Sequence, residues 1–230
     1  MALINLNKRE IHCKIIYYGP GRCGKTTNLL YIYNAMNNRA RSKMLTIETK
    51  GDRTLFFDLL PLNLGKINGF DIRIQLYSVP GQTTYKATRK LVLKGVDGLV
   101  FIADYLKVRH EKNIESFQDL QHNLLEHNLT LEEIPIILQF NKCDLVPTPI
   151  PTLTKEELET DLNRELKTKI FEAAATKGMG VFETLKEISK RTVHYVATKH
   201  LLTSHCKNTQ GERPWIRQKK SLIPKALLKT

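Results

Sequence analysis

The sequence predicts an α/β fold, with a mostly parallel six-stranded sheet, one antiparallel hairpin at its edge and helices on both faces. Apolar runs typical of buried strands alternate along the chain with amphipathic segments typical of helices. This alternation is characteristic of a parallel sheet covered on both sides. The 230 residues are enough for one such domain with a full core.

Six segments are expected to be strands, because each is a continuous apolar run or alternates apolar with polar residues. They are residues 11–18, 62–67, 70–77, 97–104, 134–140 and 169–175. Asn68-Gly69 separates the second segment from the third and is a strong signal for a tight turn. We therefore expect those two strands to form the antiparallel hairpin.

Four helices are expected between or after these strands. The first begins at Gly24 or Lys25, and residues 37–51 after it form a polar, basic loop with one short strand near Met44. The second covers residues 109–128, with Ile114, Phe117, Leu120 and Leu124 on its inner face. The third opens at Thr154-Lys155-Glu156-Glu157, a capping-box pattern. The last runs from Val181 to about Lys199, with Phe182, Leu185, Ile188 and Thr192 inward.

The segment Gly19–Thr26 matches the phosphate-binding pattern G-x-x-x-x-G-K-[ST] without a mismatch. In this pattern, backbone N–H groups surround phosphate oxygens, the Lys25 ammonium reaches the β- and γ-phosphates, and the Thr26 hydroxyl ligates Mg²⁺. The following helix points its positive N-terminal end at the same anion. A plain glycine turn is the alternative, and the flanking strand and helix argue against it. The residues expected to hold the phosphates are Gly19, Gly21, Arg22, Cys23, Gly24, Lys25, Thr26 and Thr27.

A second motif, Asn141-Lys142-Cys143-Asp144, follows the fifth predicted strand. A carboxylate there accepts two hydrogen bonds from the guanine ring N–H and amine, and adenine lacks both donors. We predict that Asp144 selects guanine, that Asn141 braces the loop and that the Lys142 stem covers the base. The Ala175 N–H, at the end of the last strand, is predicted to donate to the guanine carbonyl. Taken alone, the four-residue motif also fits a solvated turn, and Ala175 also fits a strand end of small residues.

Two further segments fit loops that sense the γ-phosphate. Val79-Pro80-Gly81-Gln82 ends the hairpin, where the Gly81 N–H is placed to bond the γ-phosphate and Gln82 to orient an attacking water. In the loop before the hairpin, Thr54 is the candidate second hydroxyl ligand of Mg²⁺. Arg53 is a candidate for neutralising transition-state charge. An exposed turn and a solvated surface arginine are the alternatives.

Composition excludes several classes of protein. The four cysteines have no C-x-x-C spacing, which favours a reducing cytosol over disulfides or zinc. No signal core, membrane-length apolar run, myristoylation pattern or C-terminal prenylation cysteine is present. A cytoplasmic protein is therefore expected. Of the formal net charge of +13, residues 199–230 contribute eight Lys or Arg against one Glu.

Together these motifs resemble the Ras-like small GTPases, and most closely their bacterial branch, the mutual gliding-motility protein A (MglA) family. The similarity covers residues 1–198 in order, which we expect to form the GTPase domain. The segments that carry it are Arg9–Lys14, Tyr17–Gly21, Gly24–Leu29, Asp52–Asp58, Val79–Gln82 and Leu93–Gly98.

The resemblance implies a P-loop small-GTPase G domain that binds GTP, GDP and Mg²⁺ and acts as a slowly hydrolysing switch. It implies that Arg53 is an intrinsic arginine finger and that Gln82 positions water. It also implies a roadblock-type activating partner and a GTP-bound form that marks a cell pole and recruits motility or polarity effectors.

The sequence departs from these patterns in three places. Ser78 stands where most Ras-like proteins carry the aspartate that organises Mg²⁺, and the gliding family usually has threonine there. Arg22 replaces an apolar residue and puts a cation beside the phosphates. Residues 199–230 lie outside the resemblance and form a basic extension.

The basic extension interleaves cations with apolar residues such as Trp215, Ile216 and Leu222. This pattern suits an anionic membrane surface, and peripheral contact with the inner membrane is expected. An acidic partner or a solvated tail fits as well, and nucleic acid is a weaker alternative.

Two other functions stay open from the sequence. A GTP-holding assembly module with little hydrolysis is suggested by Ser78 and Arg22. The second alternative function is a P-loop ATPase or kinase, and Asp144 argues against it.

Overall fold

A computed structural model describes residues 3–37, 40–48, 56–67, 69–82 and 85–208, the last nine as helical backbone alone. The described residues form one eight-stranded sheet in the order β3-β4-β5-β2-β6-β7-β8, with β1 paired to the outer part of β2. The central strands β5, β2, β6, β7 and β8 are parallel, and β4 is antiparallel to β5. The predicted fold class is confirmed; β3 corresponds to the short strand expected near Met44, and β1 is a further strand that was not predicted from the sequence.

The strands that form the sheet differ widely in length. They are β1 (Leu3–Asn5), β2 (Glu10–Tyr18), β3 (Leu45–Glu48), β4 (Phe56–Ile67), β5 (Phe70–Ser78), β6 (Gly98–Asp104), β7 (Ile136–Asn141) and β8 (Ile170–Ala173). All seven residues of β6 and all six of β7 are buried, as expected for central parallel strands with helices over both faces.

Five α-helices and two short 3-10 helices connect the strands of the described chain. They are α1 (Lys25–Ala35), α2 (Lys86–Leu93), η2 (Lys107–Arg109), α3 (His110–Leu125), η3 (Cys143–Leu145), α4 (Lys155–Leu162) and α5 (Val181–Asn208). Helix α2 lies in a segment for which the sequence analysis made no prediction.

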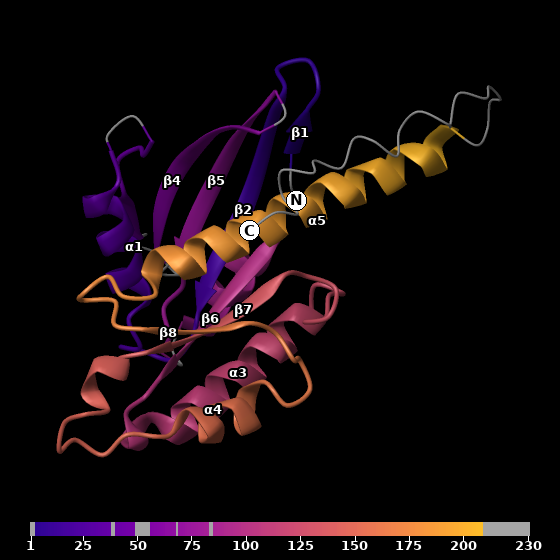
Figure 1. The fold of residues 1–230 in the computed structure, drawn as a ribbon. Helices are drawn as coiled ribbons and strands as arrows, with labels where there is room; N and C mark the ends of the chain where they lie inside the picture. The colour runs from indigo at the N-terminus through magenta and orange to yellow at the C-terminus, as the bar shows by residue number, and fades with distance from the viewer. Residues whose placement is uncertain (1–2, 38–39, 49–55, 68, 83–84, 209–230) are drawn as a thin grey trace.

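The helices divide between the two faces of the sheet (Figure 1). On one face, Leu29 and Ile32 of α1 pack with Leu185 and Ile188 of α5 in one apolar cluster. On the other, the cluster is built from α2, α3 and α4 and includes Leu93, Phe117, Leu120 and Leu158. The sheet thus separates two cores, and its carboxyl edge, where the helices begin, carries the phosphate loop.

The hairpin of β4 and β5 has an irregularity that matters for the site. At the turn, Ile67 pairs with Phe70, as the Asn68-Gly69 signal predicts. The register shifts between Asn63 and Lys66, and Gly65 in that interval has φ +81°. A left-handed residue in a bulge is favourable for glycine because it has no Cβ. Beyond the bulge, Asp58 stands directly opposite Ser78.

Helix α5 differs from expectation in length and in its first turn. It continues past Lys199 to Asn208, so the predicted boundary between the GTPase domain and the basic extension falls within a helix; in Figure 1 its end projects beyond the sheet. Phe182, predicted to face inward, is 38% exposed and lies edge-on to Tyr31. Leu185, Ile188 and Thr192 are buried as predicted. In the described part of the chain, no helix combines the length and apolarity needed to cross a membrane.

The capping box at the start of α4 gives a test of the fold. Thr154 Oγ1 accepts from the Glu157 N–H at 3.1 Å, and the Thr154 N–H donates to Glu157 Oε2 at 2.7 Å. We expect Thr154→Ala to lower the free energy of unfolding by about 1 kcal/mol, because helix donors lose their acceptor. Urea denaturation measures it. Thr160→Ala, at an exposed position within α4, is the matched control and should leave stability within about 0.5 kcal/mol. Equal stability losses would contradict the assignment.

Candidate nucleotide-binding site

The phosphate loop joins β2 to α1, and two of its glycines have no room for a side chain. Gly19 has φ +145°, and a Cβ there would lie 2.3 Å from the Ile102 carbonyl oxygen. Gly24 has φ +103°, and its Cβ would lie 2.1 Å from Asn141 Nδ2. Both positions therefore require glycine for conformation and for space, which explains the spacing of the motif physically.

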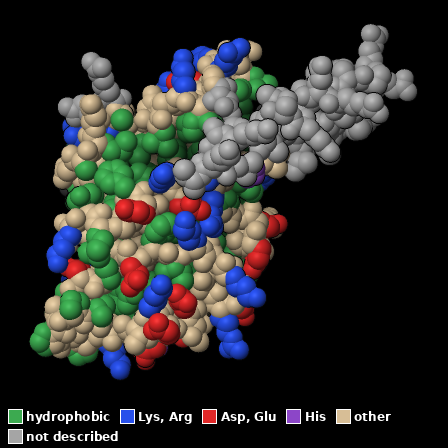
Figure 2. Space-filling view, viewed as in Figure 1, with side chains coloured by type: hydrophobic (Ala, Val, Ile, Leu, Met, Phe, Trp, Pro, Cys, Tyr) green, Lys and Arg blue, Asp and Glu red, His purple; other side chains and the backbone are tan. Residues whose placement is uncertain are grey.

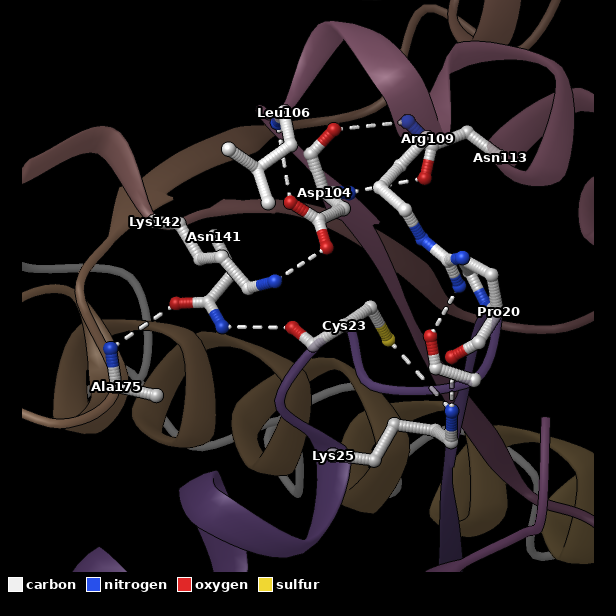
Figure 3. A network of polar contacts seen from close by, with 11 residues as sticks. Pro20, Cys23, Lys25, Asp104, Leu106, Arg109, Asn113, Asn141, Lys142 and Ala175 are labelled. Atoms are coloured by element: carbon white, nitrogen blue, oxygen red, sulfur yellow. Dashed lines mark hydrogen bonds and ion pairs between the residues drawn. The ribbon is translucent and has the colours of Figure 1, made fainter. Parts of the chain in front are cut away.

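Lys25 is 6% exposed, and its ammonium is surrounded by the loop itself. Nζ donates to the carbonyl oxygens of Gly19 at 2.7 Å and Pro20 at 2.6 Å, and lies 3.6 Å from Cys23 Sγ (Figure 3). No carboxylate of the described residues pairs with it within 4.0 Å. A buried cation held by two neutral carbonyls and a thiol is suited to an anionic ligand.

Asn141 connects the phosphate loop to the two loops on the base side of the site. Its Nδ2 donates to the Cys23 carbonyl at 2.7 Å, and its Oδ1 accepts from the Ala175 N–H at 3.0 Å (Figure 3). The residue is 2% exposed, so both ends of a buried amide are satisfied. The Ala175 N–H, predicted from the sequence to donate to guanine, bonds to Asn141 in the structure, and its use in reading a base stays a prediction.

The other residues of the Asn141 motif are held by ion pairs. Lys142 has φ +72°, and its Nζ lies 2.5 Å from Oδ2 of the fully buried Asp104. The Asp144 carboxylate lies 3.0 Å from Lys177 Nζ, and its side chain is 19% exposed. Both side chains are thus fixed beside Asn141, and neither belongs to the lining of the cleft next to the phosphate loop.

A cluster of hard oxygen ligands surrounds Thr26. Its Oγ1 donates to Asp58 Oδ2 at 2.7 Å and lies 3.4 Å from Ser78 Oγ. Thr46 Oγ1 donates to the other oxygen of Asp58 at 3.0 Å. Asp58 is 3% exposed, and within the described chain no Lys, Arg or His lies within 4.0 Å of its carboxylate. Carboxylate and hydroxyl oxygens are the ligands that Mg²⁺ prefers, so this cluster fits the ion.

Asp58 is the site residue that the sequence analysis did not identify. The sequence places Ser78 where most Ras-like proteins have a carboxylate, and the carboxylate beside Thr26 comes from the neighbouring strand, at the position directly opposite Ser78. The available signal was an acidic residue in an otherwise apolar segment, residues 55–62.

The loop that ends β5 lies against the phosphate loop. A Cβ on Gly81 would lie 2.2 Å from the Gly21 backbone nitrogen, so main chain touches main chain there. Gln82, exposed, has its Cγ beside Gly21. A cleft of about 1100 Å³ runs along this contact; it includes Arg22, Thr27 and Gln82 in its lining and extends between α2 and α3. Arg53 and Thr54, also predicted for the site, lie outside the described residues.

Arg109 is a further cation at the cleft, and no prediction covered its role. It lies at the end of η2, and its Nη2 donates to the Gly21 carbonyl oxygen. It thereby holds the outer turn of the phosphate loop on the side of α3 (Figure 3).

The fold and the site together define a P-loop nucleotide-binding protein: a phosphate loop after the central strand, a cluster of hard ligands beside it and a base-side loop joined to it. Comparison of sequences narrows the class. A model of the ADP-ribosylation factor (Arf) family matches residues 1–192. Mutual gliding-motility protein MglA of Myxococcus xanthus is 51% identical over 190 residues, which cover 83% of this chain and 95% of MglA.

Eukaryotic proteins are among the more distant relatives. Ras-related protein Rab-32C of Dictyostelium discoideum is 24% identical over 203 residues, which cover 88% of this chain and 83% of the Rab-32C chain. Ras-like protein rasS of the same organism is 27% identical over 158 residues, which cover 67% of this chain and 75% of the rasS chain. The chain belongs to the Ras-like small GTPases, in their MglA branch. Members of this class bind guanine nucleotides with Mg²⁺ and hydrolyse GTP.

Burial of Cys13 in β2 and of Cys23 in the phosphate loop predicts that both thiols are inert. Burial raises the pKa of Cys13 to about 12 and raises that of Cys23 as well, although Lys25 opposes the shift at Cys23. A raised pKa means less thiolate at pH 8, about one part in ten thousand for Cys13. We expect iodoacetamide at pH 8 to modify neither residue in the native protein and both after denaturation, measured by peptide mass spectrometry. Rapid native labelling of Cys23 with Cys13 still protected would show that the phosphate loop opens.

Proposed function

We propose that the protein is a GTP-hydrolysing molecular switch in which Gly19–Thr27 hold the phosphates and Asn141, Lys142 and Asp144 select guanine. The observation that carries this proposal is the Asn141 bridge. One buried side chain joins the Cys23 carbonyl of the phosphate loop to the Ala175 amide on the base side. The two ends of one nucleotide are then held at a fixed separation, and Asp144, a short way along from Asn141, faces the base.

Mg²⁺ is proposed to bind at Thr26 and Thr54, with Asp58 orienting the ion in place of the aspartate absent at Ser78. When bound, the ion neutralises charge on the phosphate oxygens. The Asp58 carboxylate accepts from the Thr26 hydroxyl at 2.7 Å, which directs the lone pairs of that hydroxyl away from Asp58. The presence of a carboxylate beside Thr26 argues against an assembly module without hydrolysis, because Ser78 was one of the two reasons to consider such a module, the other being Arg22.

Hydrolysis is proposed to depend on Gln82, which orients water, with Lys25 and Arg53 stabilising the charge that develops on the γ-phosphate. Gly81 is proposed to report the γ-phosphate through its main-chain N–H. The role of Arg53 rests on the resemblance to the MglA family. Turnover without an activator is expected to be slow, because the Gln82 side chain is exposed.

The cellular role is proposed from the relative. The name of MglA connects that protein with gliding motility. We propose that this chain likewise controls cell polarity and motility, that it works in the cytoplasm or at a cell pole, and that a roadblock-type protein activates its hydrolysis. The described face in Figure 2 carries both signs of charge interspersed over α3 and α4, whereas residues 199–230 carry a strong positive excess. This supports an anionic membrane as the partner of the extension.

Nucleotide choice tests the proposed function directly. By isothermal titration calorimetry with Mg²⁺, we expect binding of GTP and GDP and binding of ATP at least ~10³-fold weaker. Asp144→Asn should weaken GTP binding by about 100-fold or more, because one acceptor of the guanine N–H groups becomes a donor. Glu165→Gln, at an exposed carboxylate after α4, is the control and should bind as wild type does. An unchanged preference in Asp144→Asn would favour the ATPase alternative.

The proposed role of Asp58 can be tested with substitutions at Asp58 and at Ser78, the residue opposite it on β5. Asp58→Asn should raise the Mg²⁺ concentration needed for half-maximal GDP retention by about 10–100-fold, measured with a fluorescent GDP analogue. Ser78 faces Asp58 across the β4–β5 ladder, and its Oγ is 3.4 Å from Thr26 Oγ1. Adding Ser78→Asp to Asp58→Asn should therefore restore much of the Mg²⁺ affinity. A wild-type Mg²⁺ requirement in the single variant would refute the assignment.

A further inference from the structure

The position of Gln82 is determined by its main chain. The side chain is exposed, and residue Gly81 before it is pressed against the phosphate loop without space for a Cβ. A catalytic group that is not packed in place can be aligned only through the backbone that carries it. A displacement of about 1 Å at such a group can cost on the order of 100-fold in rate.

Arg89 holds that backbone from the side of α2. Its Nη1 donates to the Gln82 carbonyl oxygen at 2.5 Å and lies 3.3 Å from the Pro80 carbonyl oxygen. The Tyr85 N–H donates to the same Gln82 oxygen at 3.2 Å. The guanidinium thus bonds the residues on both sides of Gly81, and at 5% exposure it does so out of bulk water. Hydrogen bonds from a charged donor are stronger than neutral ones, and more so when buried.

Asp119 of α3 fixes Arg89 in turn. The Arg89 Nε lies 2.8 Å from Asp119 Oδ2, and the Tyr18 hydroxyl donates to the same oxygen at 2.5 Å. Asn123 Nδ2 donates to the Tyr18 oxygen at 3.2 Å and to the Asp119 carbonyl at 2.7 Å. Tyr18 is the residue directly before the phosphate loop. The chain of contacts therefore runs from the end of β2, through α3 and α2, to the carbonyl of Gln82.

We propose that Arg89 is a positioning residue for GTP hydrolysis, acting through the Gln82 backbone, with Asp119 and Tyr18 as its support. The proposal rests on the proposed function of Gln82. The residue type follows from the geometry: a planar guanidinium bonds a carboxylate with Nε and main-chain carbonyls with Nη1 at once, which one ammonium on a flexible stem cannot do in the same fixed arrangement. Arg89 affects the alignment of Gln82, whereas the phosphate and base loops determine the affinity for the nucleotide.

The test separates turnover from binding. Arg89→Lys keeps the charge and should lower the single-turnover rate of GTP hydrolysis by about 10–100-fold, while the Kd for GTP changes by less than about threefold. Arg191→Lys is the matched control, because Arg191 pairs with Glu187 on α5 and is not part of the cleft lining; its rate should equal that of wild type. Asp119→Asn, nearly the same shape, should lower the rate in the same direction and covers the case in which Arg89→Lys fails to fold.

A double variant, Arg89→Lys with Gln82→Leu, distinguishes a role of Arg89 in positioning Gln82 from a general structural effect. If Arg89 acts through Gln82, adding Arg89→Lys to Gln82→Leu should slow hydrolysis no further. An equal additional loss in that background, or a wild-type rate in Arg89→Lys and Asp119→Asn, would overturn the inference. Failure of the proposed function is a different result, because wild type itself would then not hydrolyse GTP.

Discussion

The arrangement of the site depends on the side chain of Asn141. At the end of β7, its amide donates to the Cys23 carbonyl and accepts from the Ala175 N–H, so three loops from three parts of the sequence are joined by two hydrogen bonds. The bridge forms only because Gly24 has no Cβ, since Nδ2 occupies the place that a Cβ would need. A buried amide that lost either partner would carry a free-energy cost of roughly 1–3 kcal/mol. Phosphate loop and base loop therefore keep a defined separation.

The bulge in the β4–β5 hairpin has a comparable consequence on the metal side. If the pairing set at Ile67 and Phe70 continued without interruption, Leu59 would stand opposite Ser78, and the side chain of Asp58 would point to the other face of the sheet. The extra residue near Gly65 moves the register by one and brings the carboxylate to the Thr26 hydroxyl. One glycine about seven residues from the site thus decides whether Thr26 has an acidic neighbour.

Local signals in the sequence predicted the local structure well. The glycines of the phosphate loop, the β4–β5 hairpin with its Ile67–Phe70 pair and the Thr154 capping box each depend on residues within a few positions, and the structure has all three. The fold class followed from the alternation of strands and helices.

Features that depend on distant contacts were beyond prediction. Asp58 reaches the site through a shifted register, and Arg89 joins it through Asp119, thirty residues along the chain. Phe182 was assigned to the inner face because helical periodicity does not show that Tyr31 meets it at the surface.

The buried charged residues at the cleft are of two kinds, those in an ion pair and those without one among the described residues. This difference indicates the role of each kind. Arg89 and Asp119 neutralise one another, and Arg89 bonds the main chain around Gly81. This suits a segment that must keep its conformation. Lys25 and Asp58 are buried too, yet within the described residues their partners are carbonyls and hydroxyls, and neither lies in an ion pair. Burying single charges is costly without a counter-charge. In the proposed function, a phosphate beside Lys25 and a divalent cation beside Asp58 would supply both counter-charges at once, so that one magnesium–triphosphate ligand would stabilise two charges that have no ion pair among the described residues.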